Sequence, residues 1–218
     1  MFLVKRVLIS ALCAACLVSA TFAQVEQKPA PEKKANARPE AAERAEPFDG
    51  ATAEKMSAQC VTLDTEAGPI EIEMLAEAAP ETARNFLNLA ATGAYDTTVF
   101  SRVVRGFVVQ GGDISTREKM TPELSRRARR TVADEPNAVK HVRGTVSMAR
   151  AAEPNSATTH FFILVGDGPH LDGTFAAFGR VRAGMEAADQ INQAELEGEK
   201  PQKPVRIRRA TVAPCPKQ

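Results

Sequence analysis

Apolar and polar residues alternate along many short segments of this chain. In one of them, Ile70, Ile72 and Met74 alternate with Glu71 and Glu73, which predicts a strand with one buried face and one face in water. Further segments with the length and apolar content of strands lie at 61–65, 100–104, 107–110, 144–148, 161–165, 176–181 and 205–212. The pattern therefore predicts eight short strands.

Two segments have helical spacing instead. Apolar residues recur every three or four positions after Pro80, which suits the first turn of a helix, and Gly93 ends the pattern. A shorter segment, Met185–Asn192, carries its apolar residues on one side. Eight short strands with only two helices indicate a mainly β fold, a closed or nearly closed barrel. From Cys60 onward about 155 residues remain, enough for one domain with a sizeable core.

Two polar residues interrupt the predicted hairpin at residues 100–110. Arg102 and Gln110 lie within strands that are otherwise rich in Val and Phe and are joined by Arg105-Gly106. Because burying an unpaired guanidinium is costly, Arg102 is either a structural residue bonded to core acceptors or part of a binding site. The hairpin alone leaves both interpretations open.

Four blocks of sequence follow one another in a characteristic order. They are FSRVVRGFVVQGGD at 100–113, GTVSMA at 144–149, FFI at 161–163 and LDGTFAAFG at 171–179. In this order they resemble the signature of the cyclophilin family of peptidyl-prolyl cis-trans isomerases, and the resemblance covers roughly residues 60–213. It implies an eight-stranded antiparallel cyclophilin-like β-barrel capped by two α-helices.

The resemblance also implies roles for individual residues. Arg102 matches the catalytic arginine, which donates towards the prolyl nitrogen, and Gln110 matches the glutamine that bonds the substrate backbone. The proline pocket corresponds to Phe107, Val108, Phe162, Leu171 and Phe175, and the ridge beneath the preceding peptide residues to Ala149 and Arg150. Val108 stands where Met is common and Phe175 where His or Tyr is frequent. These departures keep a second function open, a catalytically weak peptide-binding chaperone or scaffold.

The expected function is rotation of X-Pro bonds in exported unfolded or flexible proteins. The expected partners are proline-containing peptides and unfolded proteins, and the family's usual state is the monomer. No cofactor is implied, and no phosphate-binding, dinucleotide-binding or nucleophile motif occurs. No Cys or carboxylate lies at metal-ligand spacing near His141, His160 or His170, so no metal site is predicted.

The first 23 residues have the pattern of a secretory signal peptide. Lys5 and Arg6 precede an apolar run at 7–18, and small residues follow up to Ala23, where we expect cleavage. The run is too short for a usual membrane span, so no stable span is expected. A membrane anchor and a lipoprotein modified at Cys16 stay open as alternatives. The predicted location is periplasmic or secreted.

The segment after the signal peptide has the composition of a linker. Residues 24–58 are rich in Ala, Glu, Lys and Pro, which predicts a disordered tether because such a segment buries little apolar surface. A partly helical arm at 40–46 is the alternative. The folded isomerase domain is then residues 59–215.

Overall charge gives no reason to expect nucleic acid as a partner. Removing residues 1–23 takes two basic and no acidic residues from 28 Lys and Arg and 27 Asp and Glu, so the net charge changes from +1 to −1. A basic cluster within the long polar segment 114–137 contains Arg126, Arg127, Arg129 and Arg130. No aromatic residue interleaves it, which favours a solvated loop balanced by Glu118, Glu123, Asp134 and Glu135.

Two cysteines, Cys60 and Cys215, remain after signal cleavage. They flank the first and the last predicted strands, which are antiparallel neighbours in the cyclophilin family. The resemblance therefore implies that the two cysteines lie close together, and an oxidising compartment would favour a disulfide. Two unpaired thiols are the alternative.

Overall fold

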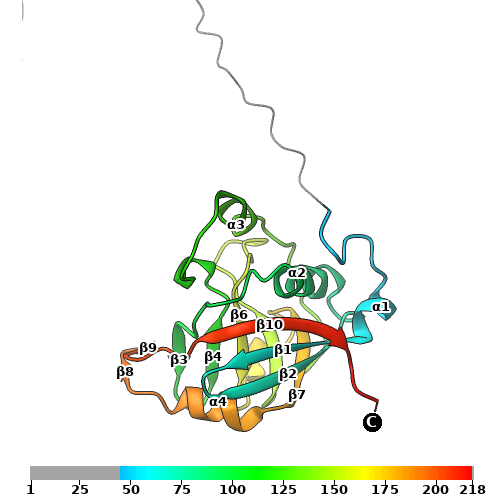
Figure 1. Cartoon of the computed structure of the whole chain (residues 1–218). Coiled ribbons are helices and arrows are strands. Elements are labelled where there is room, and N and C mark those ends of the chain that lie inside the picture. The colour runs from blue at the N-terminus through cyan, green and yellow to red at the C-terminus, as the bar shows by residue number, and fades with distance from the viewer. Residues whose placement is uncertain (1–44, 218) are drawn as a thin grey trace, which may run out of the picture. The chain divides into compact units, whose positions relative to one another are not determined.

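The computed structural model describes residues 45–217, and Figure 1 shows their arrangement. Within these residues, eight strands form one antiparallel sheet in the order β10-β1-β2-β7-β5-β6-β4-β3. They are β1 (Gln59–Thr65), β2 (Gly68–Met74), β3 (Arg102–Val104), β4 (Val108–Gly111), β5 (Thr145–Met148), β6 (Phe161–Leu164), β7 (Ala177–Ala183) and β10 (Ile207–Pro214). A separate two-stranded sheet pairs β8 (Leu196–Glu197) with β9 (Lys200–Pro201).

The prediction of a mainly β fold with eight antiparallel strands is confirmed. The sheet forms a half-barrel, which is more open than the closed or nearly closed barrel that the strand count predicted. Its end strands β3 and β10 do not pair with each other, but neighbouring segments meet in an isolated bridge between Val99 and Arg206. The physical reason is that the β8–β9 hairpin covers the outer edge of β3, where the Val103 N–H donates to the Glu199 carbonyl at 2.8 Å.

Both predicted helices are present in the described part of the chain. They are α2 (Pro80–Ala91) and α4 (Met185–Asn192); in Figure 1 they lie at opposite ends of the half-barrel, and both contribute residues to the main core. Two short helices were not predicted, α1 (Ala53–Ser57) and α3 (Pro122–Arg127), together with the 3-10 turns η1 (Ile114–Thr116) and η2 (Pro169–Leu171). No helix among residues 45–217 is long and apolar enough to cross a membrane.

The main core lies between α2 and the inner face of the sheet. Phe86 of α2 packs against Tyr95, Phe161 and Phe178, with ring centroids 5.3, 5.2 and 4.8 Å away respectively. All four rings are fully buried or nearly so, and such aromatic contacts add to the area that each ring buries. This cluster fixes β6 and β7 against α2, and β6 contributes to the site described below.

Residues 45–58 are ordered and packed, so the predicted tether is wrong for this part. Phe48 and Met56 are buried in the main core, and the Phe48 N–H donates to Asn88 Oδ1 at 2.8 Å. Two apolar anchors with a satisfied backbone are sufficient to dock a segment whose average composition is polar. Residues 24–44 of the tether and the signal peptide lie outside the described residues.

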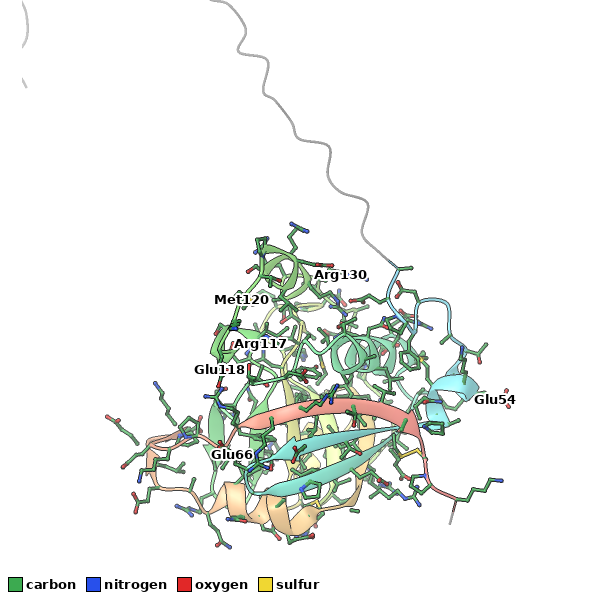
Figure 2. The ribbon with its side chains drawn as sticks, in the orientation of Figure 1. Glu54, Glu66, Arg117, Glu118, Met120 and Arg130 are labelled. Atoms are coloured by element: carbon green, nitrogen blue, oxygen red, sulfur yellow. A yellow bond between two sulfur atoms is a disulfide. The ribbon has the colours of Figure 1, made fainter. Side chains whose placement is uncertain are left out.

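One arginine of the basic cluster is structural. Arg127 and Glu46 form an ion pair at 2.6 Å with side chains only 9 % and 11 % exposed, and Arg127 Nη2 also donates to Asn85 Oδ1 at 2.8 Å. Glu46 Oε2 is also 3.5 Å from Arg130 Nη1. Glu46 therefore balances two arginines of the basic cluster, a role that the sequence predicted for Glu118, Glu123, Asp134 and Glu135. Glu135 instead accepts bonds from the first backbone N–H groups of α2, at 2.8 and 3.0 Å, and stabilises that helix end. Figure 2 shows Arg117, Glu118, Met120 and Arg130 around the excursion that carries α3.

Cys60 and Cys215 form a disulfide between the start of β1 and the end of β10, with Cα atoms 4.8 Å apart. These strands pair antiparallel over their whole length, and the Cys215 N–H donates to the Ala58 carbonyl at 3.0 Å. The disulfide therefore joins the first and the last strand of the large sheet, at the far end of the strand order from β3.

Candidate active site

A row of side chains crosses three neighbouring strands on the face of the sheet that points away from the main core. Arg102 on β3 lies opposite Gln110 on β4, and Gln110 lies opposite Phe162 on β6. The adjacent row is fully buried in the main core: Val103, Val109 and Ile163. Because successive strand residues point to opposite faces, Arg102, Gln110 and Phe162 face outward together.

A second apolar cluster, separate from the main core, lies beside this row. Its buried members are Val108, Phe162, Leu164 and Leu171, and Val104, Phe107, Ala149 and Phe175 pack against them. The ring of Phe162 meets that of Phe175 edge-on at 5.9 Å, and Phe107 lies 5.3 Å from the His170 ring. The structure thus brings together all the apolar residues that the sequence assigned to the proline pocket. Phe161, one position earlier on β6, belongs to the main core.

Arg102 lies at the edge of this apolar cluster and is not a buried structural arginine. Its Nη1 donates to Gln110 Oε1 at 3.3 Å and its Nε to Glu199 Oε2 at 2.6 Å. Both members of the ion pair are open to solvent, with 43 % of the Arg102 and 57 % of the Glu199 side chain exposed. The bond from Arg102 lowers the pKa of Glu199. No sequence signal pointed to Glu199, because it comes from a hairpin 97 residues later.

The chain matches known proteins over most of its length. Residues 60–212 match the family described as cyclophilin type peptidyl-prolyl cis-trans isomerase/CLD. The protein belongs to the cyclophilin family. It is 39% identical over 162 residues to peptidyl-prolyl cis-trans isomerase A of Dickeya dadantii. This match covers 70% of this chain and 83% of the relative.

Two further comparisons agree. Peptidyl-prolyl cis-trans isomerase CYP18-1 of Arabidopsis thaliana is 36% identical over 155 residues, covering 70% of this chain and 94% of the relative. A crystal structure of a Cryptosporidium parvum cyclophilin type peptidyl-prolyl cis-trans isomerase, obtained in the presence of the dipeptide Ala-Pro, superposes with a TM-score of 0.62 at 29% identity. That match covers 71% of this chain and 98% of the other. The protein is therefore a cyclophilin-type peptidyl-prolyl cis-trans isomerase.

In this cyclophilin, Arg150 extends the apolar cluster with a cation. Its guanidinium carbon lies 5.1 Å from the centre of the Phe175 ring, and Phe175 in turn packs on Phe162. Nη1 of Arg150 donates to the Ala151 carbonyl at 3.1 Å, while Asp134 is 3.9 Å from its Nε. The stacked guanidinium covers one side of the Phe175 ring, which holds that ring against the pocket.

Asn192, at the end of α4, holds the hairpin that carries the site. Its Oδ1 accepts from the Gly106 N–H at 2.8 Å, and its Nδ2 donates to the carbonyls of Val104 and Val108 at 2.9 and 3.2 Å. Gly106 takes a positive φ of 69°, which suits glycine at this tight turn. One buried amide therefore fixes both strands of the β3–β4 hairpin, a role that the sequence did not reveal.

A buried row of hydrogen bonds lies beside the apolar cluster. Ser147, opposite Phe162 in the sheet, is 3.1 Å from His141 Nε2, and His141 Nδ1 is 3.2 Å from Asp172 Oδ1. Burial lowers the pKa of His141, so its imidazole is neutral at neutral pH. These contacts have the order of a serine nucleophile with its base, but Ser147 has no exposed surface to meet a substrate. These hydrogen bonds therefore serve to position two pocket residues, Phe162 beside Ser147 and Leu171 next to Asp172.

Asp172 makes the stability of this cyclophilin depend on acid pH. The backbone N–H of His141 at 2.8 Å and then Lys140 Nζ at 3.0 Å lower the pKa of Asp172 to about 2. An unfolded Asp titrates near pH ~3.9, so the stabilisation is complete above that pH and is lost as the pH falls towards the native value. Urea unfolding of the wild type and of Asp172→Asn from about pH 5 to about pH 2 should show a steeper loss in the wild type. Parallel curves would contradict this assignment.

Proposed function

We propose that this cyclophilin accelerates X-Pro rotation by combining the apolar cluster with the guanidinium of Arg102. The observation that carries the proposal is the row Arg102–Gln110–Phe162, which places a forked donor and an amide beside an apolar wall on one face of the sheet. The proline ring would pack against Phe162, Phe107 and Leu171. Gln110 would bond the peptide backbone next to the proline.

The chemistry of this reaction needs no covalent intermediate and no proton transfer. Amide rotation has a barrier of about 18–20 kcal/mol because resonance is lost at the perpendicular geometry. In that geometry the prolyl nitrogen regains its lone pair and becomes an acceptor, so a fixed N–H donor stabilises it more than the planar ground state. An apolar wall stabilises the less polar twisted amide relative to the planar one. Lowering the barrier by about 7 kcal/mol would raise the rate by about five orders of magnitude.

Proline-containing peptides and unfolded proteins are the substrates that this site fits. The Cryptosporidium relative was crystallised in the presence of Ala-Pro, and its chain is covered almost completely by the match. Among residues 45–217, no group of three or more His, Cys, Asp or Glu side chains is arranged to hold a metal ion. The site residues themselves supply the donor and the wall that the mechanism uses.

We also propose that the protein acts outside the cytoplasm. The signal-peptide pattern of residues 1–23 and the Cys60–Cys215 disulfide support this location, because disulfides persist in oxidising compartments. Folding chains that await X-Pro isomerisation would be its substrates there. Mass spectrometry of the chain isolated from its own cells tests the proposal. A mass that still includes residues 1–23, together with recovery of the protein from the cytoplasmic fraction, would reject it.

The decisive experiment is the cis-to-trans rate of a short Ala-Pro peptide with the purified protein. A large acceleration that saturates with peptide concentration supports the proposed function. A folded protein that binds the peptide without accelerating exchange would instead support the alternative, a peptide-binding chaperone or scaffold. Retention of Arg102 at the pocket edge favours the enzyme, because simple peptide binding requires no donor directed at the rotating bond.

A further inference from the structure

The β8–β9 hairpin brings an acidic residue to Arg102. Glu199 lies between these two short strands, and its backbone carbonyl accepts from the Val103 N–H at 2.8 Å. Its carboxylate binds Arg102, the residue before Val103 on β3, with Oε2 2.6 Å from Arg102 Nε. Pro201 of β9 is buried and anchors the hairpin on the side that follows Glu199. Both the backbone and the side chain of Glu199 are therefore fixed against β3.

Two hydrogen bonds fix the orientation of the Arg102 guanidinium and involve different nitrogens. Glu199 takes Nε and Gln110 takes Nη1, so the plane of the group is held at two of its three nitrogens. Within residues 45–217, Nη2 makes no hydrogen bond. A free arginine side chain loses rotamer entropy when it must be ordered during reaction, whereas a pre-oriented one does not.

Folding stability does not explain this ion pair. Both side chains are about half exposed, and surface pairs of this kind contribute little because solvent screens them. Glu199 bonds only Nε of the guanidinium, so the N–H groups of Nη2 remain available as donors to a substrate. Orientation of the donor is the role that these contacts fit.

We propose that Glu199 is a positioning residue for the isomerase reaction, which holds Arg102 by Nε so that its Nη2 meets the twisted prolyl amide. The proposal rests on the proposed function of Arg102. It assigns to the β8–β9 hairpin a part in catalysis without contact with the substrate. The effect should appear in kcat, because the apolar cluster that binds the proline ring is unchanged.

The test compares three single variants with the wild type on the Ala-Pro peptide. Glu199→Ala should lower kcat about tenfold with KM changed less than about twofold, since the donor is misplaced while the pocket remains. Glu199→Gln should keep activity within about threefold of the wild type, because its amide oxygen still accepts from Nε. Glu197→Ala, an exposed glutamate of the same hairpin, is the matched control and should behave as the wild type.

A double-mutant cycle separates positioning from a general structural effect. In the Arg102→Ala background, Glu199→Ala should cause no further loss, because its target is absent. Equal losses in both backgrounds, unchanged activity of Glu199→Ala, or a gain in activity would each overturn the proposal. These results are distinct from failure of the proposed function, in which the wild type itself does not accelerate isomerisation.

Discussion

The Arg102→Ala variant is expected to fold normally and to lose about two to three orders of magnitude in kcat/KM towards an Ala-Pro peptide. It should fold because the Arg102 side chain is 43 % exposed and its ion pair with Glu199 faces solvent. It should lose activity because the guanidinium that shares the outward row with Gln110 and Phe162 would be gone. The measurement is the cis-to-trans rate for wild type and variant at matched thermal midpoints.

Arg102→Lys is the informative control, because it keeps the charge and removes the fork. An ammonium group cannot bond Glu199 and Gln110 in the same plane while presenting another donor to the substrate. We therefore expect Arg102→Lys to be closer to Arg102→Ala than to the wild type. Full activity in the lysine variant would show that charge alone is sufficient. Full activity in the alanine variant would exclude a catalytic role for Arg102.

Strand alternation was the most informative part of the sequence. In β2, Ile70, Ile72 and Met74 are buried while the glutamates between them are only partly so, as the period of two predicted. The same period separates Phe161 in the main core from Phe162 in the second apolar cluster. Local patterns of this kind are set by the backbone itself, so they can be read from neighbouring residues.

The residues that the sequence missed act across long separations. Asn192 bonds the β3–β4 hairpin over more than eighty residues, and Glu199 reaches Arg102 over 97. Their positions follow from how α4 and the β8–β9 hairpin pack, which no local pattern specifies. The burial of Phe48 was not predicted for a different reason. Its segment is polar in average composition, and one aromatic residue changes that average little.

One missed element did have a local signal. Thr121 caps α3 by accepting from the Leu124 N–H at 3.2 Å, and Pro122 occupies the first helical position. This order of a threonine followed by proline and Glu123 is typical of a helix start. The four arginines that follow give the segment the polar composition of a loop. Of the four arginines of the basic cluster, α3 contains Arg126 and Arg127, and Arg127 is buried, so the cluster is partly structural.

Removing the disulfide is expected to have the largest effect on stability. The double variant Cys60→Ala/Cys215→Ala should lose about 2–4 kcal/mol in free energy of unfolding, with about 5 kcal/mol as the limit of the chain-entropy model. The reason is the length of the closed loop, since the two cysteines are 155 residues apart. Opening that loop enlarges the unfolded ensemble while β1 and β10 keep their backbone pairing. Urea unfolding measures the change.

Two controls distinguish this effect from damage to the native state. The m-value should rise in the double variant, because an unfolded chain without the cross-link exposes more surface. Isomerase activity well below the unfolding midpoint should stay unchanged, because the disulfide joins β1 and β10 while Arg102 lies on β3, at the other end of the strand order. Adding a reductant to the wild type should reproduce the stability of the double variant. If reduced and oxidised wild type unfolded at the same urea concentration, the cross-link would contribute nothing, and the support it lends to an extracytoplasmic location would be withdrawn.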